Sequence, residues 1–215
     1  MNYCYKVRHL LTNLFSGFLF GVILMNASQG YAEPVILAFG DSLTAGFGVD
    51  AQDSYPARLQ RLLAEKGYSY KVVNAGVSGD TTAGGAARID WVLQHNPEIV
   101  ILELGANDGL RGLSIPAMRK NLGKIIEACQ KKGAKVLLAG MEITPNLGAE
   151  YTRDFRESFT QLAKQYKVPL IPFFLENVAA HPELTRPDGV HPLAEGYAIV
   201  TQTVFQYLEP MLKKK

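Results

Sequence analysis

The sequence has few cysteines and no excess of charge of either sign. Of its 215 residues only Cys4 and Cys129 are cysteines, which excludes the disulfide framework that stabilises many small secreted domains. Its 22 Lys and Arg residues nearly balance its 20 Asp and Glu residues, giving a formal net charge of +2. This balance excludes a protein whose main task is to neutralise the phosphates of a nucleic acid. The hydrophobic content of 47% is that of an ordinary globular protein.

The N-terminal region lacks a hydrophobic run that could span a bilayer. Its apolar stretch, residues 14–25, is about 12 residues long, whereas a spanning helix needs roughly 18 to 20. The basic residues Lys6 and Arg8 precede this stretch, and no acidic residue occurs before Glu33. A short apolar run with this charge pattern is typical of a secretory signal peptide and not of a permanent membrane anchor.

We expect cleavage after Ala32, because residues 30–32 follow the small-x-small pattern of a signal peptidase site, with the Ala27 region as the alternative. The chain then consists of a signal peptide, residues 1–32, and one domain, residues 33–215. No intramolecular disulfide can form in that domain, because it keeps one of the two cysteines. We expect an exported monomer, periplasmic or secreted, without a stable membrane anchor.

Five short apolar runs alternate with amphipathic stretches along the expected domain. The apolar runs are typical of buried parallel strands, and the stretches between them repeat apolar residues at helical spacing. This alternation predicts an α/β protein with a doubly wound parallel sheet and helices on both faces. Pro169 and Pro172 place the fifth strand at an edge. The predicted strands cover residues 35–39, 70–75, 99–104, 135–139 and 168–172, and the predicted helices cover residues 54–66, 82–94, 114–132, 150–165 and 193–212.

Three of the predicted strands lead into glycine or polar residues. Ser42 follows the first strand, Gly76 the second and Asn107 the third. Doubly wound sheets bind ligands at the carboxyl ends of their strands, where these residues converge if the first strand lies between the other two. The Gly76 N–H and the Asn107 amide would then form an oxyanion hole beside the Ser42 hydroxyl. Taken alone, a serine at such a position is more often a helix cap.

A histidine and an aspartate that could complete an acyl-transfer site lie just before the last predicted helix. Asp188 and His191 are three residues apart, and Pro187 and Gly189 favour a turn around the aspartate. Its carboxylate would fix the tautomer of the imidazole and stabilise the protonated ring. The other ring nitrogen would then be free to take a serine proton near neutral pH.

Four segments together resemble a known family. The sequence GDSL at residues 40–43, Gly76, GAND at 105–108 and DGVH at 188–191 resemble, in order, the four blocks of the SGNH, or GDSL, hydrolases. The resemblance extends through the expected domain and is greatest to the bacterial periplasmic branch with acyl-CoA thioesterase, lysophospholipase and arylesterase activities. It implies a three-layer α/β/α, flavodoxin-like fold with a five-stranded parallel sheet in the order 2-1-3-4-5.

The resemblance also implies a role for each matching residue. Ser42 is the implied nucleophile, His191 the base and Asp188 the residue that orients the base. The implied oxyanion donors are the Ser42 N–H, the Gly76 N–H and the Asn107 amide. Such an enzyme cleaves carboxylic esters and thioesters, including aryl esters, acyl-CoA and lysophospholipids, through an acyl-enzyme and without a cofactor.

Residues in the loops after the third and fourth predicted strands could form a groove for an acyl chain. An equally good interpretation is that the apolar ones pack under their own loops. The arginine among them could meet a lipid or coenzyme phosphate, although a lone loop arginine is more often solvated. The candidate substrate-binding residues are Leu110, Arg111, Leu113, Ile143 and Pro145.

Two other functions fit the same residues. The protein could be a short-chain carbohydrate deacetylase on the same scaffold, or a non-catalytic module that binds lipid or glycan. A metal site is not expected, because the four histidines and the remaining cysteine show no ligand spacing. Asp41 and Asp108 border the candidate site, and we expect them to hold its loops by backbone hydrogen bonds and to face away from it.

Overall fold

The structure, a computed structural model, describes residues 33–214, so the expected signal peptide lies outside the described range. Strands and helices alternate along it as the sequence pattern predicts. The strands are β1 (Val35–Gly40), β2 (Lys71–Gly76), β3 (Pro97–Glu103), β4 (Lys135–Ala139) and β5 (Leu170–Ile171). The α-helices are α1 (Ser42–Ala45), α2 (Tyr55–Glu65), α3 (Thr82–Val92), α4 (Ala106–Leu110), α5 (Ile115–Lys131), α6 (Ala149–Tyr166) and α7 (Ala194–Leu208), and short 3₁₀ turns are η1 (Ala51–Asp53), η2 (Leu93–His95), η3 (Pro145–Leu147) and η4 (Glu209–Met211).

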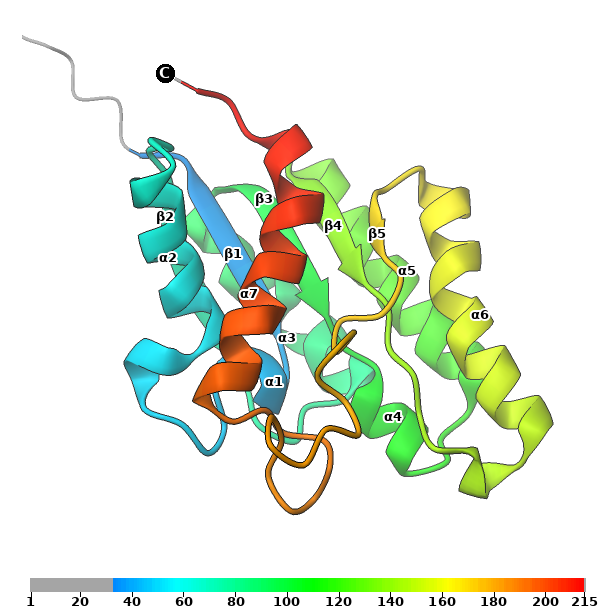
Figure 1. Cartoon of the computed structure of the whole chain (residues 1–215). Coiled ribbons are helices and arrows are strands. Elements are labelled where there is room, and N and C mark those ends of the chain that lie inside the picture. The colour runs from blue at the N-terminus through cyan, green and yellow to red at the C-terminus, as the bar shows by residue number, and fades with distance from the viewer. Residues whose placement is uncertain (1–32, 215) are drawn as a thin grey trace, which may run out of the picture. The chain divides into compact units, whose positions relative to one another are not determined.

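The strands form one five-stranded parallel sheet in the order β2-β1-β3-β4-β5, which confirms the predicted fold class. Helices α2 and α7 contact each other on one face of the sheet (Figure 1). Helices α3, α5 and α6 pack side by side on the other face (Figure 1). The chain therefore reverses its winding direction between β1 and β3, where a doubly wound sheet places its ligand site.

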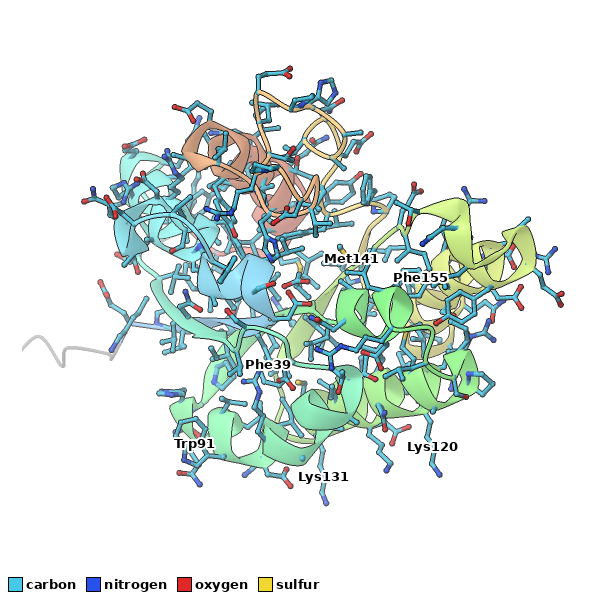
Figure 2. All side chains as sticks on the ribbon, turned by 90° about the horizontal axis from the view of Figure 1, so that it is seen from below. Phe39, Trp91, Lys120, Lys131, Met141 and Phe155 are labelled. Atoms are coloured by element: carbon cyan, nitrogen blue, oxygen red, sulfur yellow. The ribbon has the colours of Figure 1, made fainter. Side chains whose placement is uncertain are left out.

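The core lies between these layers. Phe39 of β1, Phe155 of α6 and Met141 are buried, whereas Trp91 of α3 and Lys131 of α5 point outward (Figure 2). Cys129 is also buried, as expected for a core thiol. Within residues 33–214 no helix is long and apolar enough to cross a membrane.

Two elements differ from the sequence prediction. The fifth strand is reduced to Leu170–Ile171, because the flanking Pro169 and Pro172 cannot donate ladder hydrogen bonds. The segment after β3, which the sequence indicates as a polar turn, instead winds into the short helix α4. Asn107 therefore projects from the first turn of a helix.

The sheet register brings the candidate segments together. Gly40, the last residue of β1, pairs with Gly76 of β2 on one side and with Glu103 of β3 on the other. The chain continues from these three residues into the segments that carry Ser42, the loop after β2 and Asn107. All three segments therefore leave the sheet at one edge.

Candidate active site

Three side chains from two distant segments form a hydrogen-bonded chain at this edge. Ser42 Oγ lies 2.8 Å from His191 Nε2, although the two residues are 149 positions apart in the sequence. His191 Nδ1 lies 3.0 Å from Asp188 Oδ2. In a nucleophile, base and orienting acid these distances allow proton transfer from the hydroxyl to the ring. The structure thus brings together the three residues that the sequence analysis names as a triad.

The loop before α7 holds Asp188 and His191 in place. One Asp188 oxygen accepts hydrogen bonds of 2.9 Å from the backbone N–H groups of Val190 and His191. Partial burial by itself raises the pKa of the Asp188 carboxyl, but these backbone bonds and the His191 ring lower it to about 2. The carboxylate is therefore charged at neutral pH and fixes the ring nitrogen that faces it.

An aromatic side chain packs against the histidine. The Phe47 ring, in the segment after α1, lies 4.8 Å from the His191 ring between centroids. The Arg186 guanidinium lies 5.6 Å from the Phe47 ring centroid, and Arg186 also donates to the Gly48 carbonyl at 3.4 Å. These contacts join the loop that carries the histidine to the segment that follows the serine.

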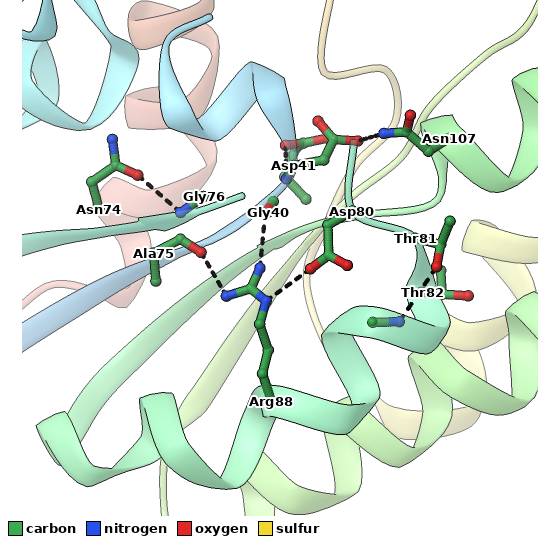
Figure 3. A network of polar contacts seen from close by, with 12 residues as sticks. Gly40, Asp41, Asn74, Ala75, Gly76, Asp80, Thr81, Thr82, Arg88 and Asn107 are labelled. Atoms are coloured by element: carbon green, nitrogen blue, oxygen red, sulfur yellow. Dashed lines mark hydrogen bonds and ion pairs between the residues drawn. The ribbon is translucent and has the colours of Figure 1, made fainter. Parts of the chain in front are cut away.

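Asn107 is held at both ends of its side-chain amide. Its Nδ2 donates to Asp41 Oδ2 at 3.0 Å (Figure 3), and its Oδ1 accepts from Arg111 at 3.3 Å. An amide nitrogen carries two hydrogens, so one remains for a substrate oxygen. The orientation of Asn107 therefore suits an oxyanion donor.

The expectation for Gly76 does not agree with the hydrogen bonding. Its N–H donates to Asn74 Oδ1 at 2.9 Å, on the edge strand β2 (Figure 3), so it is not free to meet a substrate oxygen. Gly79 lies further along the same loop, in a turn that the Asp80 N–H closes on the Val77 carbonyl. Its φ of +80° requires glycine there, and its N–H donates to no acceptor among residues 33–214.

Gly79 also lies beside the candidate amide donor. The Arg111 guanidinium that contacts Asn107 donates to the Gly79 carbonyl at 3.0 Å. Arg111 therefore joins the loop after β2 to α4 through its Nη2, so it is not a purely solvated side chain. The sequence signal for this residue is that Gly79 is a second glycine in the same segment. The sequence analysis selected Gly76, which directly ends the predicted strand, and did not consider Gly79.

Two buried carboxyl groups lie behind the serine. Asp41 and Glu103 are almost fully buried, and Glu103 Oε2 accepts hydrogen bonds from the Thr44 hydroxyl at 2.8 Å and the Asp41 N–H at 3.3 Å. Burial raises the pKa of Asp41 to about 6. Burial and the nearby Asp41 charge raise the pKa of Glu103 well above its usual range.

Glu103 is a residue that the sequence analysis missed. Its signal was an acidic residue within the apolar run of residues 99–104, where a charge is rare unless it is paired. Asp41 caps α1 by accepting from the Leu43 N–H at 3.0 Å, as expected, but it does not face away from the site. Its other carboxylate oxygen holds Asn107.

The four apolar candidate substrate-binding residues divide into three groups. Leu110 and Leu113 are exposed at the carboxyl edge of the sheet, by 49% and 41%. Ile143 is half-buried against the core, as the packing interpretation proposed. The Pro145 side chain lies outside the described part of the structure.

Other titratable side chains at this edge have structural partners. The Asp108 carboxylate accepts from the Thr82 N–H at 2.8 Å and the Thr82 hydroxyl at 2.6 Å, so it holds α3 as expected. Among residues 33–214, no group of three or more His, Cys, Asp or Glu side chains could hold a metal ion.

Several known proteins are similar to this chain over most of its length. Residues 38–199 match the model of the GDSL-like lipase/acylhydrolase family. The chain is 40% identical over 200 residues to the esterase TesA of Pseudomonas aeruginosa, covering 93% of this chain and 98% of that protein. It is 36% identical over 197 residues to thioesterase 1/protease 1/lysophospholipase L1 of Escherichia coli K12, covering 91% of this chain and 92% of that protein.

A solved structure shares the fold. The crystal structure of AlinE4, an SGNH-hydrolase family esterase, superposes with a TM-score of 0.71 at 46% sequence identity, covering 85% of this chain and 98% of that one. The family-model match runs from Ala38 in β1 to Ile199 in α7 and so spans the segments that carry Ser42, Asn107 and His191.

Proposed function

The chain belongs to the GDSL-like lipase/acylhydrolase family and is a hydrolase of ester bonds, and we propose that Ser42, His191 and Asp188 form its catalytic triad. The observation that carries the proposal is the continuous hydrogen-bonded chain from the Ser42 hydroxyl through the His191 ring to the Asp188 carboxylate. No other serine in residues 33–214 forms a hydrogen bond with a histidine ring.

In the proposed reaction Ser42 Oγ attacks the acyl carbonyl carbon and its proton passes to His191 Nε2. Asp188 stabilises the imidazolium, and the tetrahedral intermediate then collapses as the leaving alcohol or thiol takes the proton from His191. Water, deprotonated by His191, attacks the acyl-enzyme in the second half of the cycle. The acid is released and the serine proton is restored.

We assign three donors to the oxyanion. They are the Ser42 N–H, the Asn107 Nδ2 and, in place of Gly76, the N–H of Gly79. The last assignment is supported by the bond that occupies the Gly76 N–H and by the position of Gly79 beside the Arg111 and Asn107 side chains. Each such donor lowers the barrier by stabilising charge that develops only in the transition state.

The proposed substrates are esters and thioesters with an apolar acyl or aryl group. With the exception of Trp91, the large apolar side chains that are exposed in residues 33–214 lie in the segments that follow β1, β2, β3 and β4 at this edge. They are Phe47, Val77, Leu110, Leu113 and Leu147. An apolar surface beside a nucleophile favours aryl esters, acyl-CoA and lysophospholipids over acetylated sugars. We further propose that residues 1–32 direct export and are removed.

The test is hydrolysis of p-nitrophenyl esters from acetate to palmitate, and of palmitoyl-CoA, by the wild type, Ser42→Ala and His191→Ala. We expect turnover of medium or long chains that falls by several orders of magnitude in both variants. Triad-dependent activity confined to acetate would identify a deacetylase. Equal activity of variants and wild type would refute the triad, and no turnover of any ester by the wild type would favour a binding module.

A further inference from the structure

Arg88 of α3 makes three hydrogen bonds at the carboxyl edge of the sheet (Figure 3). Its Nη2 donates to the Gly40 carbonyl at 3.0 Å and its Nη1 to the Ala75 carbonyl at 2.8 Å. Its Nε donates to Asp80 Oδ2 at 2.8 Å and forms an ion pair with it. One planar group thus contacts the end of β1, the end of β2 and the loop that follows β2.

Two of the three acceptors lie close in sequence to a proposed catalytic group. Gly40 is two residues before Ser42, and Asp80 directly follows Gly79. The Gly40 carbonyl also accepts from the Val77 N–H at 3.0 Å, so the same oxygen joins β1 to the start of the loop. The position of the Gly79 N–H relative to Ser42 therefore depends on this group of contacts.

The surroundings of the Arg88 guanidinium restrict its movement. It lies 4.1 Å from the centroid of the Phe39 ring, and the Arg88 side chain is only 20% exposed. A guanidinium presents its N–H groups in a fixed plane, whereas a lysine ammonium is a point charge that cannot reproduce three divergent bonds. Arg88 touches neither Ser42 nor the Asn107 amide, so it would act through the backbone.

We propose that Arg88 is a positioning residue that sets the geometry of the oxyanion hole by fixing the loop after β2 against the nucleophile segment. The inference rests on the proposed function of Ser42 and Gly79. Arg111 donates to the Gly79 carbonyl and Arg88 to the Asp80 carboxylate, so two arginines contact consecutive residues of this loop. Misplacement of a donor by a fraction of an ångström lowers turnover without changing ground-state binding to the same extent.

A substitution at Gly84 offers a way to disturb the contact between Arg88 and Asp80 without replacing Arg88. The Asp80 carboxylate comes so close to Gly84 that a Cβ atom there would collide with Asp80 Oδ1. The obstacle is the end of a flexible side chain, and alanine is the better helix former in α3. Gly84→Ala should therefore keep the fold and push Asp80 off Arg88.

The experiment compares the processed enzyme with Arg88→Lys, Gly84→Ala, Ser42→Ala and the control Arg119→Lys. Arg119 also donates to protein acceptors, at 2.8 Å to Ser158 Oγ and 3.4 Å to the Asp154 carbonyl, but it lies between α5 and α6. We measure kcat and KM for a p-nitrophenyl ester, the rate of Ser42 labelling by a fluorophosphonate, and the thermal unfolding midpoint.

Arg88→Lys and Gly84→Ala should each lower kcat and the labelling rate, by about 10- to 100-fold for the arginine variant, with KM changed by less than about threefold. The control should keep wild-type kinetics. If Ser42→Ala is inactive but a folded Arg88→Lys variant keeps the wild-type kcat, the inference is overturned. If Arg88→Lys does not fold, a wild-type kcat in Gly84→Ala overturns it in the same way. An active Ser42→Ala would overturn the proposed function and this inference with it.

Discussion

Asn107 connects the proposed oxyanion hole to the buried acids beneath it. Its amide donates to Asp41 and so has a fixed direction before substrate arrives. Asn107→Ala removes one oxyanion donor, and we expect kcat to fall about 100- to 1000-fold with little change in KM. Steady-state kinetics with p-nitrophenyl esters measure both quantities. A KM effect alone would mean that Asn107 binds substrate and the transition state equally.

Asn74→Ala is the contrasting substitution on β2. It releases the Gly76 N–H from its side-chain acceptor and changes nothing at Gly79. If Gly79 is the donor, kcat should stay within about twofold of the wild type. A severalfold rise in kcat would instead indicate that Gly76 is an oxyanion donor which Asn74 holds back.

Glu103 gives the protein a pH-dependent stability. The pKa of Asp41 is raised from 3.8 to about 6 by burial, and that of Glu103 is raised well above its usual value by burial and by Asp41. Between pH 3.8 and about 6 the folded state therefore binds more protons than the unfolded state. The stability from these groups is therefore complete below pH 3.8 and is lost as the pH rises through about 6 and beyond.

Glu103→Gln removes one of these two buried charges. We expect its free energy of unfolding at pH 8 to exceed that of the wild type by about 1 to 3 kcal/mol, and the two proteins to be equal near pH 4. Urea unfolding at pH 4, 6 and 8 measures the difference. Glu127→Gln is the control, because Glu127 accepts from the Tyr166 hydroxyl at 2.7 Å on the exposed surface of α5. A less stable Glu103→Gln at pH 8 would contradict the prediction.

The sequence predicted individual residues only where the chemistry was local. Asp188 and His191 are three residues apart, and Ser42 lies two residues after the end of β1, so the neighbouring residues were enough to identify them as candidates. The partners of Glu103 depend on how β3 packs against α1, and no local pattern indicates that. The Asn74 side chain similarly competes for Gly76 through a contact that sequence spacing does not predict.

At the scale of elements, Asp108 joins α4 to the start of α3. Its buried carboxylate satisfies the Thr82 N–H and hydroxyl, and a negative charge there also complements the helix dipole. Asp108→Ala would leave both donors buried without a partner. We expect the free energy of unfolding to fall by about 2 kcal/mol, measured by urea unfolding at pH 7.

Asp154→Ala is the matched control for that substitution. The Asp154 carboxylate pairs with Arg153 at 3.0 Å, but the two side chains are exposed on α6. Such a pair contributes about 0 to 1 kcal/mol, so the control should unfold almost as the wild type does. Equal losses in the two variants would show that Asp108 makes no special contribution to α3.

The alternation of apolar runs and amphipathic stretches predicted the long elements well, because periodicity and capping residues specify them locally. The predicted strand at residues 135–139 agrees with β4, and Ser114 caps α5 as expected, accepting from the Ala117 N–H at 3.4 Å. Helix α4 was missed, because its five residues are too few to show a period.

At the scale of the whole molecule, the proposed function does not require residues 1–32. Every proposed catalytic residue lies within residues 33–214, the part of the chain that the structure describes. Lys6 and Arg8 are the acidic or basic residues of the sequence before Glu33, so residues 33–215 contain equal numbers of acidic and basic residues.

Protein beginning at Glu33 should therefore fold and act like the exported enzyme. We compare it with the protein isolated after export. We expect the two kcat values to agree within about twofold and the two unfolding midpoints to agree within about 2 °C. The intact mass of the exported protein should correspond to residues 33–215, which tests the cleavage site independently. Loss of the cooperative unfolding transition in the shortened protein would contradict the assignment of one complete domain to residues 33–215. A mass that retains residues 1–32 would contradict their removal as a signal peptide.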